Sequence, residues 1–248
     1  MAHRRSLIPT LPTAIATLYS VLAHAGGLAL LCRPRPLDVA LGVCLVSHAR
    51  VVAAVLVHDA THEAVIRRGL PNAVAGTLLL WLAGCPYCYF PRVQRVHIAH
   101  HRDRADTVDF DYRAYIGCRP MLKTFVIACE TLFVPAVELL MHARCAFSPL
   151  LWPQSELHRL NSVVGIGAVA YLCSRLYEAG GCVAPLAWFV TTCILIHVLN
   201  YHDAFAHTYI VVDADAPGYR PGPMDRTAAY EEENTYSTGA RTKSCPLG

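Results

Sequence analysis

The strongest constraint on the fold comes from four apolar stretches that are long enough to cross a lipid bilayer. They cover about residues 11–32, 38–57, 161–178 and 183–201. A helix needs roughly 20 apolar residues to cross hydrocarbon, and backbone groups in lipid must pair within the segment, which favours helices over strands. Only 16% of the residues are charged, whereas soluble domains carry about 25%. We therefore expect an all-α integral membrane protein with about four transmembrane helices.

Short connections join these stretches into two helical hairpins. Residues 33–36 read Arg-Pro-Arg-Pro, and residues 178–181 read Glu-Ala-Gly-Gly. Two further apolar stretches, at about 71–90 and 121–141, are ambiguous from length alone. The second carries two glutamates eight residues apart, on roughly one helical face. Because a carboxylate facing lipid is costly, we expect this stretch to lie at the membrane interface.

The basic residues predict the sidedness of the protein. If both hairpin turns face outward, Arg33, Arg35 and Arg175 lie outside and Arg50 lies within a span. The other 17 of the 21 lysines and arginines then lie inside. This distribution satisfies the positive-inside rule, so we expect both termini on the cytoplasmic side.

Histidines at helical spacing follow the second apolar stretch. His58 and His62 are four residues apart, so on a helix both imidazoles can contact one metal ion. This pair alone is equally well explained by solvated histidines at a helix end. His97, His100 and His101 lie within five residues, and their spacing places the first on the same side as the other two. Three imidazoles so close together are hard to explain as packing, because buried histidines need partners.

The two histidine groups can share a site only if the chain between them returns to the same membrane face. We therefore expect the stretch 71–90 to be re-entrant or interfacial. Two spans then bring a third group, His202 and His207, back to that face. These two are five residues apart, so on a regular helix only one readily faces a common site. Isolated histidines such as His142 lack convergent partners, and we do not expect them to bind metal.

An all-histidine site at the water interface suits borderline transition metals such as iron. Acidic residues follow the second histidine group directly. They either accept hydrogen bonds from the imidazole N–H groups or form a solvated acidic loop. These residues are Asp103, Asp106, Asp109 and Asp111.

Cysteine usage adds one weaker signal. The chain has eleven cysteines, most of them inside apolar runs, which is typical of small hydrophobic residues and not of a disulfide framework. Cys85 and Cys88 form a CxxC motif without a second such pair. Alone, this motif only weakly indicates zinc or redox chemistry.

Two segments resemble the first and second histidine boxes of the membrane fatty acid desaturase superfamily, which includes acyl-chain hydroxylases and carotenoid oxygenases. They are His58-Asp59-Ala60-Thr61-His62 and His97-Ile98-Ala99-His100-His101-Arg102-Asp103. Asp203 and His207 resemble the family's additional ligand position after the last span. Residues 230–237 resemble the stretch before the third box in bacterial members. The resemblance implies a desaturase-like domain over residues 1–237, followed by a polar tail, 238–248, that we expect to be disordered.

The resemblance also implies a set of site residues. Two iron ions would be held by His58, His62, His97, His100, His101 and His207, with His202 as an alternative ligand. Carboxylates near these ligands would accept hydrogen bonds from the imidazoles, namely Asp59, Asp103, Asp106 and Asp203.

The sequence departs from the family at its third box. Family members carry a third HxxHH box, and no histidine follows His207 here. We therefore expect a truncated or frame-shifted member whose di-iron site is incompletely filled and whose activity is reduced or absent.

The function implied by the resemblance is O2-dependent desaturation or hydroxylation of an acyl chain or similar lipid. The sequence shows no Rossmann fingerprint, haem-attachment motif or iron–sulfur cysteine set, so a partner such as a ferredoxin or cytochrome would supply electrons. The alternatives are a non-catalytic family remnant and a metal transporter, although transport sites sit near the bilayer midplane. The net charge of +3 and the lack of a basic stripe argue against nucleic acid as a partner.

Overall fold

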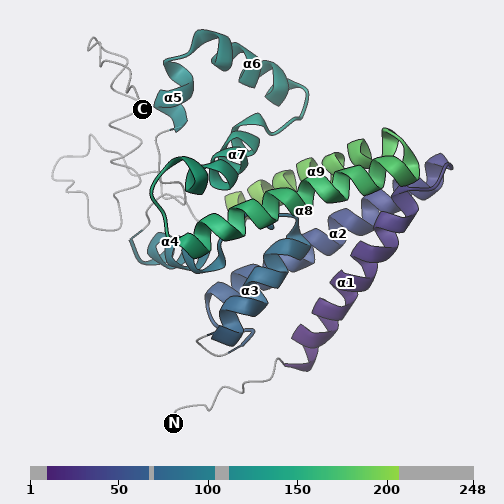
Figure 1. Cartoon of the computed structure of the whole chain (residues 1–248), viewed down its shortest axis with the longest axis horizontal. Coiled ribbons are helices and arrows are strands. Elements are labelled where there is room, and N and C mark those ends of the chain that lie inside the picture. Colours follow the sequence, from purple (N-terminus) through teal and green to yellow (C-terminus); the bar gives the residue numbers. More distant parts are fainter. Residues whose placement is uncertain (1–9, 67–69, 104–111, 207–248) are drawn as a thin grey trace.

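The structure is a computed structural model that describes residues 10–66, 70–103 and 112–206, without the side chains of residues 100–103 and 203–206. Within these residues the chain forms nine helices and no strand (Figure 1). Four of the helices are long and apolar enough to cross a membrane. This confirms the all-α membrane fold that hydropathy predicts.

The four candidate spans form two hairpins, as predicted. Pro36 occupies the first turn of the second span, where its missing N–H leaves no hydrogen bond unmade. Both hairpin turns lie at the same end of the bundle, on the right in Figure 1. The spans are α1 (Leu11–Leu31), α2 (Pro36–Thr61), α8 (Glu156–Gly180) and α9 (Val183–Ala206), and the apolar part of α9 is Val183–His202.

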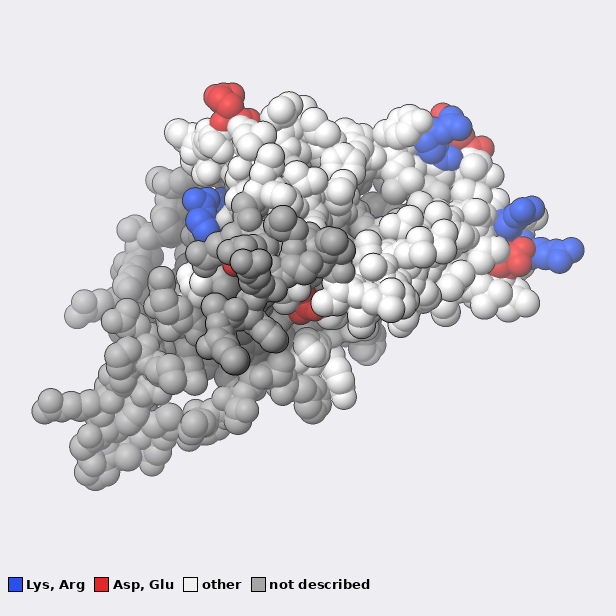
Figure 2. Space-filling view, turned by 90° about the horizontal axis from the view of Figure 1, so that it is seen from below, with Lys and Arg blue, Asp and Glu red and all other residues white. Residues whose placement is uncertain are grey.

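Large apolar side chains cover the outer faces of the spans. The exposed fraction is 63% for Leu22 on α1, 55% for Val163 on α8 and 63% for Leu186 on α9. Figure 2 shows a long uncharged surface between charged side chains at the end that holds the hairpin turns and others toward the opposite end. A continuous apolar surface of this extent is unfavourable in water and is the surface that lipid requires.

Small residues allow α1 and α2 to approach each other closely. A Cβ atom added at Gly27 would lie 3.1 Å from the carbonyl oxygen of Gly42, and one added at Gly42 would lie 2.9 Å from the carbonyl oxygen of Gly27. Small residues at such crossings let helix backbones pack directly, which compensates for the weak hydrophobic drive between helices in lipid. This contact fixes the first hairpin.

The ambiguous stretch 71–90 forms a helix, a turn and the start of a second helix. The helices are α3 (Leu70–Ala83) and α4 (Phe90–Asp103). At the turn, Gly84 has a φ of 93°, a left-handed conformation that favours glycine. Phe90 is fully buried and its ring lies against Gly76, where any added Cβ would overlap it. The two helices therefore pack as a unit.

This α3–α4 segment enters and leaves at the same end of α2. At the start of α3, Asn72 donates a hydrogen bond to the last turn of α2. At its end, Gly84 lies against the Arg50 guanidinium, further along α2. On α4, Gln94 Nε2 then donates to the backbone oxygen of Thr61, the final residue of α2, at 3.1 Å. The chain therefore returns to its starting level, as expected of a re-entrant segment.

The second ambiguous stretch, 121–141, is broken into two helices. Helix α5 (Tyr112–Gly117) leads into α6 (Pro120–Thr131), and α7 (Ala136–Leu151) follows after a bend of 118°. The pair is long and apolar enough to cross only as one broken span. The bend is compatible with the interfacial placement that the sequence favours, which stays a prediction.

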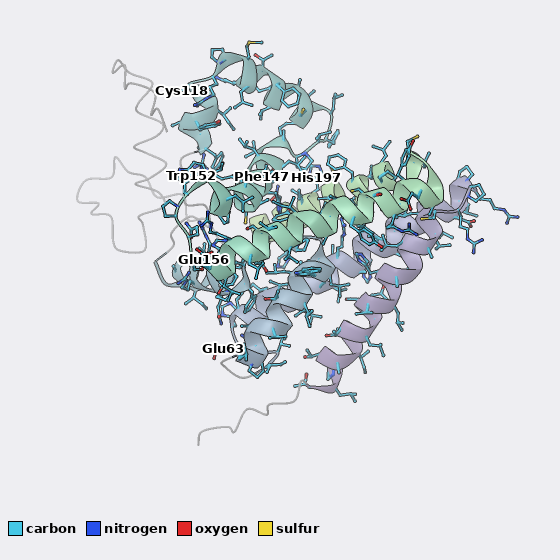
Figure 3. All side chains as sticks on the ribbon, in the orientation of Figure 1. Glu63, Cys118, Phe147, Trp152, Glu156 and His197 are labelled. Atoms are coloured by element: carbon cyan, nitrogen blue, oxygen red, sulfur yellow. The ribbon has the colours of Figure 1, made fainter. Side chains whose placement is uncertain are left out.

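Two polar contacts hold the bend between α6 and α7 against α9. The imidazole Nε2 of His197, labelled in Figure 3, donates to the backbone oxygen of Phe133 at 2.9 Å. One helical turn further along α9, Asn200 Nδ2 donates to Glu138 Oε1 at 2.7 Å. Glu138 is one of the two glutamates that made a lipid-facing helix unfavourable, and its carboxylate is therefore paired with a polar partner.

Candidate metal centre

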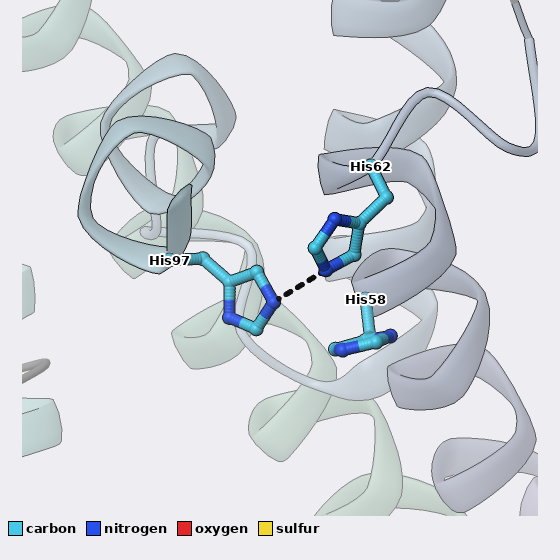
Figure 4. A group of neighbouring side chains, drawn as sticks. All are labelled: His58, His62 and His97. Carbon is cyan, nitrogen blue, oxygen red and sulfur yellow. Dashed lines mark hydrogen bonds between the residues drawn. The ribbon is translucent and has the colours of Figure 1, made fainter. Parts of the chain in front are cut away.

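Three imidazoles gather where α2 ends and α4 returns (Figure 4). The ring centroids of His58, His62 and His97 are 4.8 Å, 4.7 Å and 5.0 Å apart, which makes a nearly equilateral triangle. Nε2 of His62 lies 3.0 Å from Nε2 of His97. One ring nitrogen from each residue lies within 4.8 Å of the other two. The structure thus joins the first histidine pair to the first member of the second group.

The backbone at the end of α2 explains where His62 lies. Glu63, labelled in Figure 3, has a φ of 61° and donates its N–H to the oxygen of Ala60 at 3.0 Å. The N–H of Ala64 reaches back to the oxygen of Asp59 at 2.9 Å. These two bonds form a Schellman motif, which pairs the last carbonyl groups of a helix. His62 is therefore the capping residue, one turn beyond His58.

Two amide side chains hold the α3–α4 segment on the end of α2. Asn72, which is 2% exposed, donates to the oxygen of Ala60 at 3.0 Å, and Gln94 donates to the oxygen of Thr61. Gln94 precedes His97 by three residues, so both lie on one side of α4. We infer that Gln94 fixes the rotation of α4 and so directs His97 toward the two histidines of α2.

The cluster is accessible from outside the protein. The side chain of His58 is 51% exposed and that of Asp59 is 48% exposed. Asp59 Oδ1 lies 3.6 Å from Nδ1 of His58, which is too long for a hydrogen bond. At this distance the carboxylate would still attract an imidazole that carries positive charge. His97 is partly buried. Water, dioxygen or a substrate could therefore reach the cluster.

The spacing of one nitrogen pair is compatible with two ligands of a metal ion. A metal–imidazole bond is about 2.1 Å long, so two imidazole nitrogens at a right angle around one ion lie about 3.0 Å apart. The separation between His62 and His97 has this value, which is also the length of the hydrogen bond that joins the two rings in Figure 4. Imidazole ligands suit iron, zinc, copper and nickel, so iron fits the donor set without being selected by it.

The remaining predicted site residues are only partly described. His202 is exposed on the last turns of α9. His100, His101 and Asp103 lie on α4 and Asp203 lies on α9, but their side chains are outside the described residues. His207, Asp106 and the tail 238–248 lie wholly outside them. The ligand set as a whole therefore stays a prediction, of which the structure brings three members together.

Sequence reasoning missed the residues that position the cluster. Asn72 and Gln94 are uncharged amides in apolar or mixed surroundings, and neither belongs to a histidine motif. For Gln94 a signal was present, because it lies one helical turn before His97. For Asn72 the signal was a polar residue inside an apolar run, which in a buried site needs a hydrogen-bond partner.

Four candidate spans with an imidazole cluster at one helix end define an integral membrane protein with a candidate metal centre. A family model described as fatty acid desaturase matches residues 34–243. The chain belongs to the fatty acid desaturase family, which confirms the resemblance seen in the histidine boxes. Comparisons with curated proteins and with solved structures gave no match. The family supports an oxidoreductase that acts on lipid.

Proposed function

We propose that the chain is a membrane-bound di-iron oxidoreductase that uses dioxygen to desaturate or hydroxylate an acyl chain or a similar lipid. The observation that carries this proposal is the cluster of His58, His62 and His97. Family membership supports the lipid chemistry, and the nitrogen spacing supports the metal. The choice between desaturation and hydroxylation stays open, because both begin with removal of a hydrogen from the lipid.

In this proposal the protein supplies ligands from separate segments. His58 and His62 come from α2, and His97 comes from the re-entrant segment, 35 residues further along. When bound, the iron ions would activate dioxygen for attack on a C–H bond. The carboxylate of Asp59 would attract the imidazole of His58 and steady its orientation. His100, His101 and His207 would add to the ligand set, with His202 as the alternative, and without a third HxxHH box this set is short of the family's full one. Asp103, Asp106 and Asp203 would accept hydrogen bonds from imidazole N–H groups.

The length of α2 allows the histidines and the Arg33–Arg35 turn to lie at opposite membrane surfaces. At 26 residues the helix is about 39 Å long, which exceeds the roughly 30 Å of the hydrocarbon layer. His62 would then lie at the opposite membrane surface from the turn that holds Arg33 and Arg35. We propose that this turn faces outward and that the histidines and both termini face the cytoplasm. A ferredoxin or cytochrome could then deliver electrons from the same side.

Two variants and a control on the same helix test the function. His62→Ala and His97→Ala should each lower bound iron by at least 10-fold. Even the loss of a group that only hydrogen-bonds a metal ligand lowers metal affinity or activity 10–100-fold. His48→Ala is the control, because His48 hydrogen-bonds Tyr19 and lies ten residues before His58. Iron is measured on protein purified from membranes. Lipids of the expressing cells are analysed by mass spectrometry.

The products distinguish the two reactions. Desaturation removes two hydrogens from the acyl chain, whereas hydroxylation adds one oxygen. Whichever product the unmodified chain forms should disappear with His62→Ala and persist with His48→Ala. If His62→Ala retains the iron and the lipid products of the unmodified chain, the cluster is not the reaction centre and the proposal is wrong.

A further inference from the structure

A second group of metal-binding side chains surrounds the tip of the re-entrant segment, away from the histidine cluster. Cys85 and Cys88 lie in the turn between α3 and α4, and His142 and Cys145 lie on α7. Sγ of Cys88 is 3.5 Å from Sγ of Cys145. Sγ of Cys85 is 3.9 Å from Nδ1 of His142, which also lies 2.9 Å from the hydroxyl oxygen of Tyr87.

The structure supplies the second ligand pair that the CxxC motif lacked. His142 and Cys145 are three residues apart on α7, so they share one face of that helix. Cys85 and Cys88 are brought together by a tight turn, in which the N–H of Cys88 donates to the oxygen of Cys85 at 3.0 Å. A turn with two cysteines facing a helix with a histidine and a cysteine is a donor arrangement of structural zinc sites.

We propose that Cys85, Cys88, His142 and Cys145 form a structural zinc site that ties the re-entrant segment to α7. In a tetrahedral Cys3His site with Zn–S bonds of about 2.3 Å, the sulfurs lie about 3.8 Å apart and sulfur and nitrogen about 3.5 Å apart. The distances of 3.5 Å for Cys88 to Cys145 and 3.9 Å for Cys85 to His142 are within a few tenths of these values. Side-chain rotations would have to bring the two pairs together around one ion. The ion would take the place of the Tyr87 hydroxyl on His142.

A buried cation beside the turn supports an anionic centre there. Arg50 is 1% exposed, and a Cβ added to Gly84 would lie 3.0 Å from its Cζ. Its Nη1 donates to Thr192 Oγ1 at 2.7 Å and its guanidinium lies over the ring of Trp188. Among the described residues, its Nε and Nη2 have no hydrogen-bond partner.

Such a cation is expensive to bury without compensating charge. Moving a charged group from water into a protein interior costs several kcal/mol of desolvation free energy, even after the protein has relaxed around it. An arginine does not avoid this cost by losing its proton, because it stays protonated. A zinc ion with three thiolates and a neutral imidazole carries one net negative charge, which would balance Arg50.

Helix α8 holds the turn in the shape that the site needs. Asn161 Nδ2 donates to the backbone oxygens of Pro86 and Cys88, each at 3.2 Å. One turn later, Gly165 lies directly against the backbone of Pro86 and Tyr87. Contacts with α8 therefore hold the backbone of the turn that carries Cys85 and Cys88. A metal ion would bind α7 to this turn, which α2 and α8 already contact.

A disulfide between Cys88 and Cys145 is the competing explanation. Their sulfurs are 3.5 Å apart, well beyond the roughly 2.05 Å of an S–S bond. Such a bond would use two of the four donors and leave Arg50 without a compensating charge. Zinc accounts for all four donors and for the cation, so it is the explanation that the geometry favours.

Cobalt substitution tests the proposal on the full-length protein in detergent. The protein is stripped of metal with a chelator under reducing conditions and titrated with Co²⁺. We expect about one equivalent to give an intense thiolate-to-cobalt charge-transfer absorption, which an all-histidine site cannot produce. Cys85→Ser with Cys145→Ser should abolish this absorption and remove about one zinc ion per chain. The matched control, Cys173→Ser with Cys193→Ser, should change neither.

The test is independent of the proposed lipid chemistry. Replacing His58, His62 and His97 together should leave the thiolate–cobalt absorption intact, so a failure of the proposed function would not affect this result. Two outcomes would overturn the zinc proposal. One is the absence of the absorption in the unmodified, reduced protein. The other is recovery of Cys88 and Cys145 as a disulfide-linked peptide from protein alkylated directly in the membrane.

Discussion

Replacing Gly165 with alanine should destabilise the protein through its contact with the tip of the re-entrant segment. A Cβ atom at this position would lie 2.5 Å from the carbonyl carbon of Pro86 and from Cα of Tyr87, whereas ordinary contacts begin at 3.4 Å. The opposing atoms are backbone and cannot rotate away. Two hydrogen bonds from Asn161 also hold this turn. The turn or α8 would have to retreat by roughly 1 Å in a close-packed interior.

The magnitude follows from a control on the same helix. A Cβ atom at Gly167 would meet nothing within 4 Å in the described part of the chain. Alanine gains about 0.5–1 kcal/mol over glycine inside a helix, and this gain applies to both positions. The difference between Gly165→Ala and Gly167→Ala therefore isolates the overlap, which should cost about 1–3 kcal/mol.

Thermal unfolding of the two variants in detergent measures this difference. For a chain of this size, 1 kcal/mol shifts Tm by about 2–4 °C, so Gly165→Ala should unfold about 2–12 °C below Gly167→Ala. The displaced turn should also make Cys88 react faster with a thiol reagent. Equal Tm values and equal Cys88 reactivity would refute the close contact between α8 and the turn.

Three further substitutions test the positioning contacts. Gln94→Leu should lower metal affinity at the histidine cluster about 10-fold by freeing α4, measured by competition with a chelator; unchanged affinity would show that Gln94 does not position His97. Asn72→Leu should lower the free energy of unfolding by about 0.5–1.5 kcal/mol, because the carbonyl of Ala60 loses one of its two hydrogen bonds and keeps the one from Glu63; unfolding at the unmodified temperature would contradict this. Thr192→Val removes the hydrogen bond to Arg50 and should cost about 1.5–3 kcal/mol, whereas a neutral result in the same assay would show that Arg50 finds another partner.

The sequence alone determined the membrane spans and the first histidine pair. A span is recognised from the length of an apolar run, and this property is local to the run, so hydropathy located all four candidate spans. His58 and His62 share a face because residues four apart lie one above the other on a helix. That residues 71–90 bring the chain back to the end of α2 also follows from the sequence, since two ligand groups on one membrane face require it, whereas the choice between a re-entrant and an interfacial segment stays a prediction.

The tertiary structure decided which distant side chains meet. The local signals at Gln94 and Asn72 do not identify the end of α2 as their partner, because those contacts exist only once the re-entrant segment has folded back. Likewise, Cys88 and Cys145 are 57 residues apart, and their meeting depends on the bend before α7. Helical spacing determines which residues share a face of one helix, whereas the packing of turns against neighbouring helices determines which faces come together.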